Sequence, residues 1–285
     1  MSRITRLYYY TLLGAIGGLI GWQVSNVLGL SFAQNVYLSE VVVGGLIGFC
    51  IGALIGASEG VALRSAGYAL RAGLQNGLFG LVGGAIGLPL AEGAFQLLGG
   101  DAWTRAVGWA VFGGFIGAGL GFSSGSQMWK PALGGLLGGA VGGALLELAR
   151  VRLADALIGK AIGLGLLGAA IGALIALIVL LLSRAWLEVV SGKLKGTEFV
   201  LDKFVHANGP TAYVGSSALK ADIVLPDPDI DPQHAILTGG DTHMNIRDMS
   251  QKGTFINGRK VQQARLLDEQ AIRLGNTQLV YHEKR

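Results

Sequence analysis

The sequence predicts an α+β chain in two parts: a glycine-rich bundle of transmembrane helices, followed by a small all-β sandwich. The first sign is residues 163–182, which contain no charge, amide or proline. At 1.5 Å per residue this segment makes roughly 30 Å of helix, enough to cross the hydrocarbon core of a bilayer. The second sign is a shift in composition, because 39 of the 48 glycines precede residue 185, whereas all four histidines and 12 of the 18 acidic residues follow it. We therefore predict a membrane domain over residues 1–184 and a soluble domain over residues 186–285.

Charge and cysteine content exclude several classes of protein. Mean hydropathy is +0.53 and only 14% of the 285 residues are charged. Up to residue 184 there are 10 Lys and Arg against 6 Asp and Glu, and beyond it 12 against 12. The basic balance therefore belongs to the membrane half, which indicates cytoplasmic loops and not nucleic-acid binding. Cys50 is the only cysteine, so an intrachain disulfide is excluded.

The membrane half divides into six predicted spans. The first begins at three tyrosines, Tyr8 to Tyr10, which are typical of an interfacial aromatic belt and favour an uncleaved span over a signal peptide. Several of the others are short for a 30 Å core, so some of them could thin the bilayer or stop short of crossing. The six segments are 8–30, 41–57, 74–90, 107–122, 131–146 and 163–182.

An internal repeat relates the four middle spans. Residues 51–60 (IGALIGASEG) match residues 116–125 (IGAGLGFSSG), and Val82-Gly-Gly-Ala85 matches Val141-Gly-Gly-Ala144. The copies extend over 43–92 and 108–147, and each is interpreted as a span–loop–span hairpin.

Glycines in these spans recur at every fourth residue and therefore share one helix face. Such rows let two helix backbones approach closely, where van der Waals and Cα–H···O contacts hold helices together. We expect them to be packing surfaces; a glycine-lined pore or sliding interface is the alternative. The rows chosen as packing candidates are Gly48, Gly52 and Gly56 in the second span and Gly113, Gly117 and Gly121 in the fourth.

Acidic residues at the span ends could mark an ion path. They are Glu59, Glu92, Glu147 and Asp155, and Pro89 is expected to break the helix close to Glu92. The membrane half contains no histidine, which disfavours a proton pump.

The distribution of Lys and Arg predicts that both termini are cytoplasmic. An even number of spans places the termini on one side, and Arg3, Arg6, Arg64 and Arg71 fall in loops on that side. The 150–160 segment contradicts this bias, so residues 148–156 are alternatively a surface helix, or the fifth segment is re-entrant.

After residue 184 the apolar pattern alternates, as in half-buried strands. Short strands bounded by Gly, Pro, Asp or Asn over about 100 residues predict a β-sandwich. The first two, 186–190 and 197–201, are expected to form a hairpin. The others are 212–214, 222–225, 235–237, 244–246, 254–256, 271–274 and 278–281.

The motifs of this part resemble those of forkhead-associated (FHA) domains. They are Gly215, Asp222-Ile-Val-Leu-Pro-Asp227, His234-Ala235, Asp248-x-Ser250-x-x-Gly253-Thr-Phe-Ile-Asn-Gly258 and Ile272-x-Leu-Gly275. The resemblance covers nearly all of residues 187–282. It implies an eleven-stranded sandwich whose loops at one end bind phosphothreonine peptides.

The phosphate-binding positions depart from the FHA pattern. Where the family usually has an arginine after the glycine this chain has Ser216, where it has a serine this chain has Asp231, and Lys252 replaces an asparagine. Of the residues that the family has at these positions, this chain shares only His234, and the resemblance implies that His234 supports the loop. Phosphate favours a bidentate arginine and hydroxyl donors, whereas Asp231 would repel it and Lys252 would compensate in part. Phosphothreonine recognition and a phosphate-independent protein contact both remain open.

Candidate peptide contacts are taken from these loops, although Asn257 and the glycines are better explained as turn residues that need positive φ. The candidates are Ser216, Ser217, Asp231, His234, Lys252 and Asn257.

The sequence therefore predicts a membrane-anchored protein-interaction module without catalytic residues, cofactor or metal site. The expected partners are a protein, with a phosphothreonine protein as one option, and the lipid bilayer; homo-oligomerisation stays open and nucleic acid is not expected. The alternative is a channel or transporter regulated by the FHA-like domain, which would need a polar path through Glu59, Glu92 and Asn76. The FHA-like domain is expected in the cytoplasm.

Overall fold

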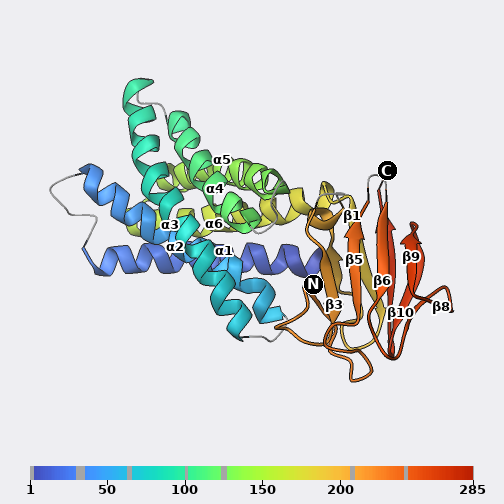
Figure 1. The fold of residues 1–285 in the computed structure, drawn as a ribbon. Helices are drawn as coiled ribbons and strands as arrows, with labels where there is room; N and C mark the ends of the chain where they lie inside the picture. The colour runs from blue at the N-terminus through green and yellow to red at the C-terminus, as the bar shows by residue number, and fades with distance from the viewer. Residues whose placement is uncertain are drawn as a thin grey trace. The chain divides into compact units, whose positions relative to one another are not determined.

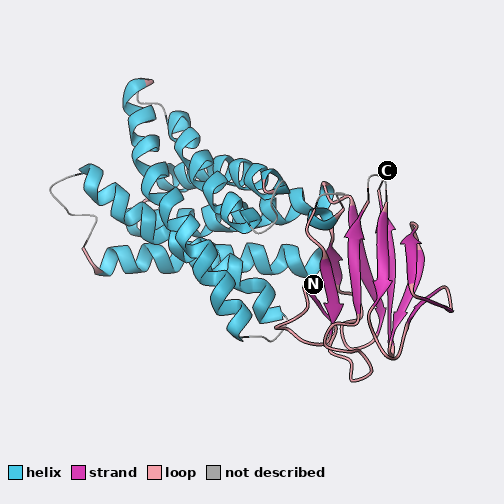
Figure 2. Cartoon of the chain, viewed as in Figure 1, coloured by secondary structure: helices cyan, strands magenta, loops and turns pink. Residues whose placement is uncertain are grey.

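The computed structural model contains two compact units, one comprising Ile4–Leu182 and one containing Ser183–Arg285. The residues described are 3–29, 36–62, 66–99, 102–122, 127–205, 209–240 and 243–284. Arg64 and residues 123–125 of the repeat lie outside these ranges, and the side chains of Arg3 and Glu59 are likewise outside the described part. The first unit is helical and the second is built of strands, as Figures 1 and 2 show, which confirms the predicted fold class.

The first unit contains six described helices, and each predicted span overlaps one of them. Long apolar runs rich in Gly, Ala and Leu form these helices, and interactions between helices compensate for the low helix propensity of glycine. The helices are α1 (Arg3–Val27), α2 (Val36–Ala62), α3 (Ala66–Leu97), α4 (Ala102–Gly121), α5 (Trp129–Arg152) and α6 (Ala156–Leu181).

Two details of the helices correct the sequence-based expectation. Pro89 does not break its helix, because α3 continues to Leu97. Just before the proline, Gly87 packs against Phe112 of α4, and a proline inside a membrane helix is tolerated where neighbouring helices pack around it. A separate surface helix over 148–156 is also wrong, because α5 extends to Arg152 and a short turn then leads into α6. Asp155 caps α6 by accepting hydrogen bonds from the N–H groups of Leu157 and Ile158 at 2.8 and 3.1 Å.

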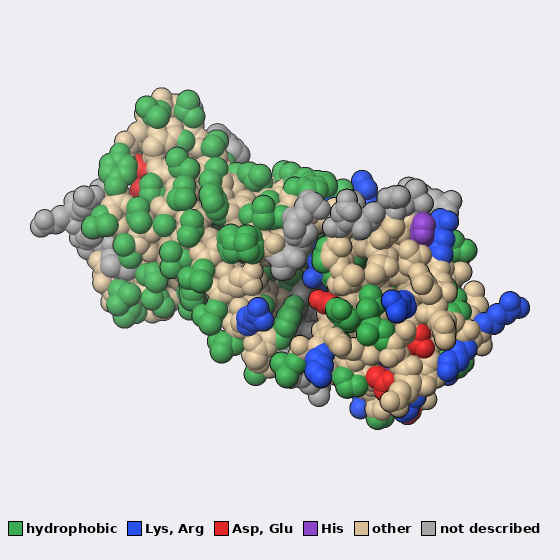
Figure 3. Space-filling view, viewed as in Figure 1, with side chains coloured by type: hydrophobic (Ala, Val, Ile, Leu, Met, Phe, Trp, Pro, Cys, Tyr) green, Lys and Arg blue, Asp and Glu red, His purple; other side chains and the backbone are tan. Residues whose placement is uncertain are grey.

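Four of the described helices are long and apolar enough to cross a membrane by length and composition. These segments are Tyr37–Ser58, Ala66–Leu97, Trp129–Arg152 and Ala156–Leu181. Helices α1 and α4 are not among them, so the expected number of six spans stays a prediction. Hydrophobic side chains cover the visible face of the helical unit, whereas charged side chains gather on the visible face of the strand unit (Figure 3).

Glycines lie where α2 meets α3. A Cβ atom added to Gly48 would be 2.0 Å from the carbonyl oxygen of Gly80, and one added to Gly52 would be 2.4 Å from that of Asn76. A Cβ on Gly56 would meet the side-chain amide nitrogen of Asn76 at 2.4 Å. No side chain larger than hydrogen fits at these three positions without a shift of one helix.

The corresponding glycines of the second repeat copy lie where α4 meets α5. A Cβ on Gly113 would be 2.1 Å from the carbonyl oxygen of Gly135, and one on Gly117 would be 2.0 Å from that of Pro131. At Gly121 the added atom would be 2.5 Å from the ring of Pro131. The two repeat copies therefore use equivalent glycines for the same close helix–helix approach.

The second unit is a sandwich of a six-stranded and a five-stranded sheet. The first, sheet A, has the order β2-β1-β11-β10-β7-β8, and the second, sheet B, has the order β4-β3-β5-β6-β9. The strands are β1 (Ala185–Ser191), β2 (Glu198–Val200), β3 (Ala212–Gly215), β4 (Ile223–Val224), β5 (Ala235–Gly239), β6 (Met244–Asp248), β7 (Thr254–Ile256), β8 (Arg259–Val261), β9 (Gln263–Leu266), β10 (Gln270–Leu274) and β11 (Thr277–Glu283). The predicted hairpin of β1 and β2 is confirmed.

Alternating side chains from both sheets form the core of the sandwich. Leu187 of β1 and Tyr281 of β11 are opposite one another and are buried with the inward side chains of sheet B. Strands β8 and β9 were missed by the sequence reading, because they are short and consist largely of polar residues, including Arg259, Lys260 and Gln263.

Candidate protein-interaction site

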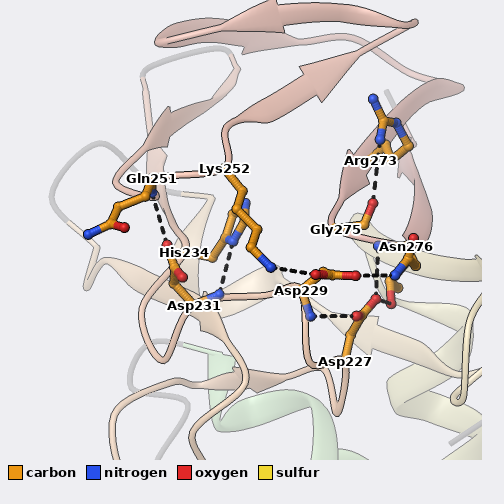
Figure 4. A network of polar contacts seen from close by, with 10 residues as sticks. Asp227, Asp229, Asp231, His234, Gln251, Lys252, Arg273, Gly275 and Asn276 are labelled. Carbon is orange, nitrogen blue, oxygen red and sulfur yellow. Dashed lines mark hydrogen bonds and ion pairs between the residues drawn. The ribbon is translucent and has the colours of Figure 1, made fainter.

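Four loops at one end of the sandwich form the candidate site, and every candidate residue except Asn257 lies in one of them. They are the β3–β4 loop (216–222), the β4–β5 loop (225–234), the β6–β7 loop (249–253) and the β10–β11 turn (275–276). Figure 4 shows the polar contacts that join the last three. We call these four loops the loop end.

Asp227 fixes the β4–β5 loop to the β10–β11 turn. Its Oδ1 accepts from the N–H of Asp229 at 2.9 Å. Its Oδ2 accepts from the N–H of Asn276 at 3.0 Å and from the hydroxyl of Thr277 at 2.8 Å. Burial favours a raised pKa for Asp227, but the hydrogen bonds from Asp229, Thr277 and Asn276 outweigh it and lower the pKa. Asp227 is therefore a charged structural residue of the loop end.

Asp229 holds the one lysine that the sequence reading expected to meet a phosphate. The ammonium of Lys252 forms an ion pair with Oδ1 of Asp229, and the side-chain amide of Asn276 donates to Oδ2 (Figure 4). The hydrogen bond from Lys252, and to a lesser extent that from Asn276, lowers the pKa of Asp229. The hydrogen bond with Asp229 in turn raises the pKa of Lys252. In this structure the cation is already neutralised by a carboxylate of its own chain.

His234 supports the loops from inside the sandwich. Its ring is fully buried, and Nδ1 accepts from the N–H of Asp231 at 3.2 Å. Because Nδ1 is an acceptor, the proton resides on Nε2, which lies 3.3 Å from the carbonyl oxygen of Gly253. The carboxylate of Asp231 in turn accepts from the N–H of Gln251 at 3.0 Å. His234 thus joins the β4–β5 and β6–β7 loops and does not face solvent.

Asp248 shapes the β6–β7 loop. Its Oδ1 accepts from the hydroxyl groups of Ser250 at 2.8 Å and Thr254 at 2.9 Å, and from the N–H of Ser250 at 3.2 Å. Burial favours a raised pKa for Asp248, but the hydrogen bonds from Ser250 and Thr254 more than offset it and lower the pKa. The Ser250 hydroxyl oxygen also accepts from the N–H of Gly253 at 2.7 Å.

The other candidates have separate positions. Ser216 and Ser217 begin the β3–β4 loop and are half-buried; the N–H of Ser216 donates to the carbonyl oxygen of Asp231 at 3.0 Å. Asn257 lies in the β7–β8 turn with φ +48°, and its side-chain oxygen accepts from the N–H of Ala271 at 3.2 Å. The turn interpretation of Asn257 therefore agrees with its backbone.

Gly215 differs from the other motif glycines, because it does not have positive φ. A Cβ there would be 2.2 Å from the carbonyl oxygen of Pro232. Close approach of two loops, and not a left-handed backbone, requires glycine at this position, whereas Gly253, Gly258 and Gly275 do have positive φ.

The residues of the network that sequence reasoning missed include Asp229 and Asn276. The alternating aspartates at 227, 229 and 231 were a visible signal of a carboxylate-rich loop. The contact of Asn276 with Asp229 carries no sequence signal, because 47 residues separate the two.

In the helical unit, Glu92 and Glu147 are paired with arginines. Arg105 of α4 contacts Glu92 of α3 at 3.1 Å and Glu147 of α5 at 3.8 Å. Arg150 contacts the other oxygen of Glu147 at 3.1 Å. This network joins three helices, and it leaves neither Glu92 nor Glu147 available as an uncompensated charge for the ion path of the alternative reading.

Within the described ranges, no group of three or more His, Cys, Asp or Glu side chains is placed to hold a metal ion.

One family model matches the sandwich. Residues 188–284 match the family model described as inner membrane component of T3SS, cytoplasmic domain. Among curated proteins no significant match to the chain was found.

Solved structures similar to the chain are FHA domains and a T3SS protein. The FHA domain of the CT664 protein from Chlamydia trachomatis is 36% identical, with 36% of this chain and 100% of that chain covered and a TM-score of 0.33. The cytoplasmic domain of the T3SS sorting platform protein PscD from P. aeruginosa is 20% identical, with coverage of 36% and 82% and a TM-score of 0.31. An FHA domain of an Arabidopsis thaliana hypothetical protein is 21% identical, with coverage of 36% and 87% and a TM-score of 0.33.

Residues 188–284, about a third of the chain, therefore match the family described as inner membrane component of T3SS, cytoplasmic domain.

Proposed function

We propose that this chain is a membrane-anchored protein-interaction module whose FHA-type domain recruits or organises a protein partner at the cytoplasmic face. The observation that carries the proposal is the match of residues 188–284 to a cytoplasmic domain of an inner membrane component, in a chain with four helices apolar enough to span. The proposal assigns binding, not catalysis, to the domain. It takes the domain boundaries to be 1–184 and 186–285 and the termini to be cytoplasmic.

The partner is bound with little dependence on phosphothreonine. Ser216 offers a hydroxyl where a guanidinium fork would be needed for bidentate phosphate binding. The ammonium of Lys252 is paired with Asp229, and Asp231 adds a carboxylate beside it. A phosphate entering the loop end would have to displace Asp229 from Lys252 and would be repelled by the remaining aspartates.

Titration of the full chain with phosphothreonine peptides tests this. The chain is held in detergent, and a degenerate phosphothreonine library is compared with its unphosphorylated counterpart by fluorescence anisotropy. The expected result is equal binding of both libraries, or no phosphopeptide binding tighter than about millimolar, which corresponds to roughly 4 kcal/mol. A single phosphothreonine sequence bound at micromolar affinity, with loss of that binding in Lys252→Ala, would contradict the proposal.

We further propose that the helical unit acts as the anchor through close glycine contacts, with Gly48, Gly52, Gly56, Gly113, Gly117 and Gly121 as packing positions. The close backbone approaches at these glycines support the packing role.

A further inference from the structure

A row of cationic and aromatic side chains crosses the outer face of sheet A. Phe255 of β7 is opposite Lys260 of β8 on one side and Arg273 of β10 on the other. The neighbours of Phe255 along β7, Thr254 and Ile256, are buried in the core, so alternation turns Phe255 outward. We call Lys260, Phe255 and Arg273 the cationic row.

The two cations of the row are exposed and uncompensated. Both side chains are solvent-exposed, and neither forms an ion pair with a carboxylate in the part of the chain that the structure describes. The guanidinium carbon of Arg273 lies 4.0 Å from the centre of the Phe255 ring, and Nη1 also donates to the carbonyl oxygen of Gly275 at 3.5 Å, so both contacts orient the side chain. The side chain of Lys260 lies over the backbone of Gly253, because a Cβ atom added to Gly253 would clash with it.

The charge of the row is opposite to that of the neighbouring loop end. At the loop end Asp222, Asp227, Asp229 and Asp231 outnumber Lys220 and Lys252, and Lys252 is already paired. An acidic protein segment would therefore be repelled by the loop end and attracted to the row. Across two strand spacings the Cα atoms of Lys260 and Arg273 are about 10 Å apart. Carboxylates two residues apart lie on the same face of an extended segment, about 7 Å from one another, and the long side chains of Lys260 and Arg273 can reach both.

Protection of a sheet edge does not account for the whole row. Lysine on an edge strand discourages edge-to-edge aggregation, which would explain Lys260 on β8. Arg273 is on β10, the third strand from that edge, where its neighbours already satisfy the backbone. A second exposed cation stacked on an aromatic ring inside the sheet therefore needs another reason.

We propose that the cationic row is a docking surface for an acidic segment of a protein partner. This inference rests on the proposed protein-interaction function and names the surface and the charge of the partner. The carboxylates of the segment pair with Lys260 and Arg273, while its backbone lies over Phe255.

The test uses the full chain in phosphatidylcholine nanodiscs and a fluorescein-labelled octaglutamate peptide, with octaglutamine as the neutral probe. Anisotropy is measured for the wild type and for the Lys260→Gln/Arg273→Gln variant. The matched control is Arg247→Gln/Arg265→Gln, which removes the same charge from exposed positions on β6 and β9 of sheet B. Thermal unfolding of each variant verifies that it is folded.

Octaglutamate should bind the wild type and the control within about twofold of one another, and the row variant about fivefold or more weakly, because that variant loses two exposed charge pairs with the peptide. Absence of wild-type binding, or an equal loss in both variants, would overturn the docking surface. The docking surface would also be overturned if the chain bound phosphatidylserine vesicles more tightly than octaglutamate and lost that binding in the row variant. This result would assign the row to lipid.

Capture of protein partners on the same preparations separates this inference from the proposed function. Capture that survives Lys260→Gln/Arg273→Gln overturns the assignment of the surface and leaves the proposed function standing. A wild-type chain that captures no protein counts against the proposed function itself.

Discussion

Asp229 and Lys252 set the charge that the loop end offers to a ligand. They come from different loops, and their ion pair engages with Asp229 the same ammonium that also interacts with Asp227 and Asp231. Both side chains are about half exposed, so their contribution to folding stability is small. Their importance is for ligand selection, because a paired ammonium is not free to receive a phosphate.

Replacing Asp229 by Asn should release Lys252. The change removes the competing carboxylate and keeps a side chain of similar size that can still contact Asn276. We expect Asp229→Asn to bind phosphothreonine peptides more tightly than the wild type in an anisotropy titration. The double variant Asp229→Asn/Lys252→Ala is the control and should show no gain. Equal binding by wild type and Asp229→Asn would mean that the ion pair is not what limits phosphate binding.

Replacing Asp248 by Asn should reduce the stability of the sandwich in a pH-dependent way. The folded pKa of Asp248 is lowered, so the ionised carboxylate stabilises the fold above the unfolded pKa of about 3.9. That stabilisation is lost as the pH falls through the folded pKa. At pH 7 we expect a loss of about 1–3 kcal/mol, typical of disrupted buried hydrogen bonds, and a smaller difference from wild type near pH 2. Chemical denaturation at both pH values measures it, and a difference that does not change with pH would contradict the assignment.

In the first unit, helices pack in pairs at positions where glycines let the two backbones come into contact. The rows predicted from four-residue spacing coincide with close approaches of α2 to α3 and of α4 to α5. Helices α1 and α6 meet in the same manner, since a Cβ on Gly14 would be 2.2 Å from the carbonyl oxygen of Gly168. In lipid the hydrophobic effect does not drive helices together, so such contacts supply van der Waals energy that larger residues would prevent.

Gly48→Ala should destabilise the helical unit, whereas Gly45→Ala should not. Both positions are in α2 and gain the same helix propensity, but the added Cβ would be 2.0 Å from backbone at Gly48 and 3.5 Å from the nearest atom at Gly45. Overpacking of this kind costs about 1–3 kcal/mol. Thermal stability in detergent is the measurement. If both variants unfold together with the wild type, Gly48 faces lipid and not α3.

The sequence predicted elements better than contacts between elements. Continuous apolar runs located all six helices, and alternation located nine of the eleven strands, because burial patterns are local properties of the chain. Strands β8 and β9 carry little apolar alternation and are defined by pairing with β7 and β6. Helix α3 continues past Pro89 although proline breaks a helix by local rules, and the Asp229–Lys252 pair depends on the sandwich bringing two loops together. Such features arise from tertiary packing, which local patterns do not encode.

On the scale of the whole molecule, the arginines near the helix ends do not all favour the same orientation in the membrane. Arg6 and Arg71 favour a cytoplasmic N-terminus, whereas Arg150 and Arg152, in the last turn of α5, oppose it. We expect a fluorescent-protein fusion after Arg285 to be fluorescent in the cytoplasm. Activity of an alkaline phosphatase fused at the same position would show that the C-terminus is on the opposite side.

The FHA-type domain should fold without the helical unit. All eleven strands lie between Ala185 and Glu283, and the core of the sandwich consists only of residues from this part. The first strand is fixed from inside the same unit, because Asp202 accepts hydrogen bonds from the N–H groups of Arg184 and Ala185 at 2.8 and 3.1 Å. A fragment of residues 183–285 should therefore show β-type circular dichroism and one cooperative unfolding transition. A fragment starting at residue 190 is the control and should fail to fold, since it lacks most of β1, which pairs with both β2 and β11. Aggregation of the longer fragment, or equal folding of both, would show that the sandwich is not the independent unit that its core and strand pairing indicate.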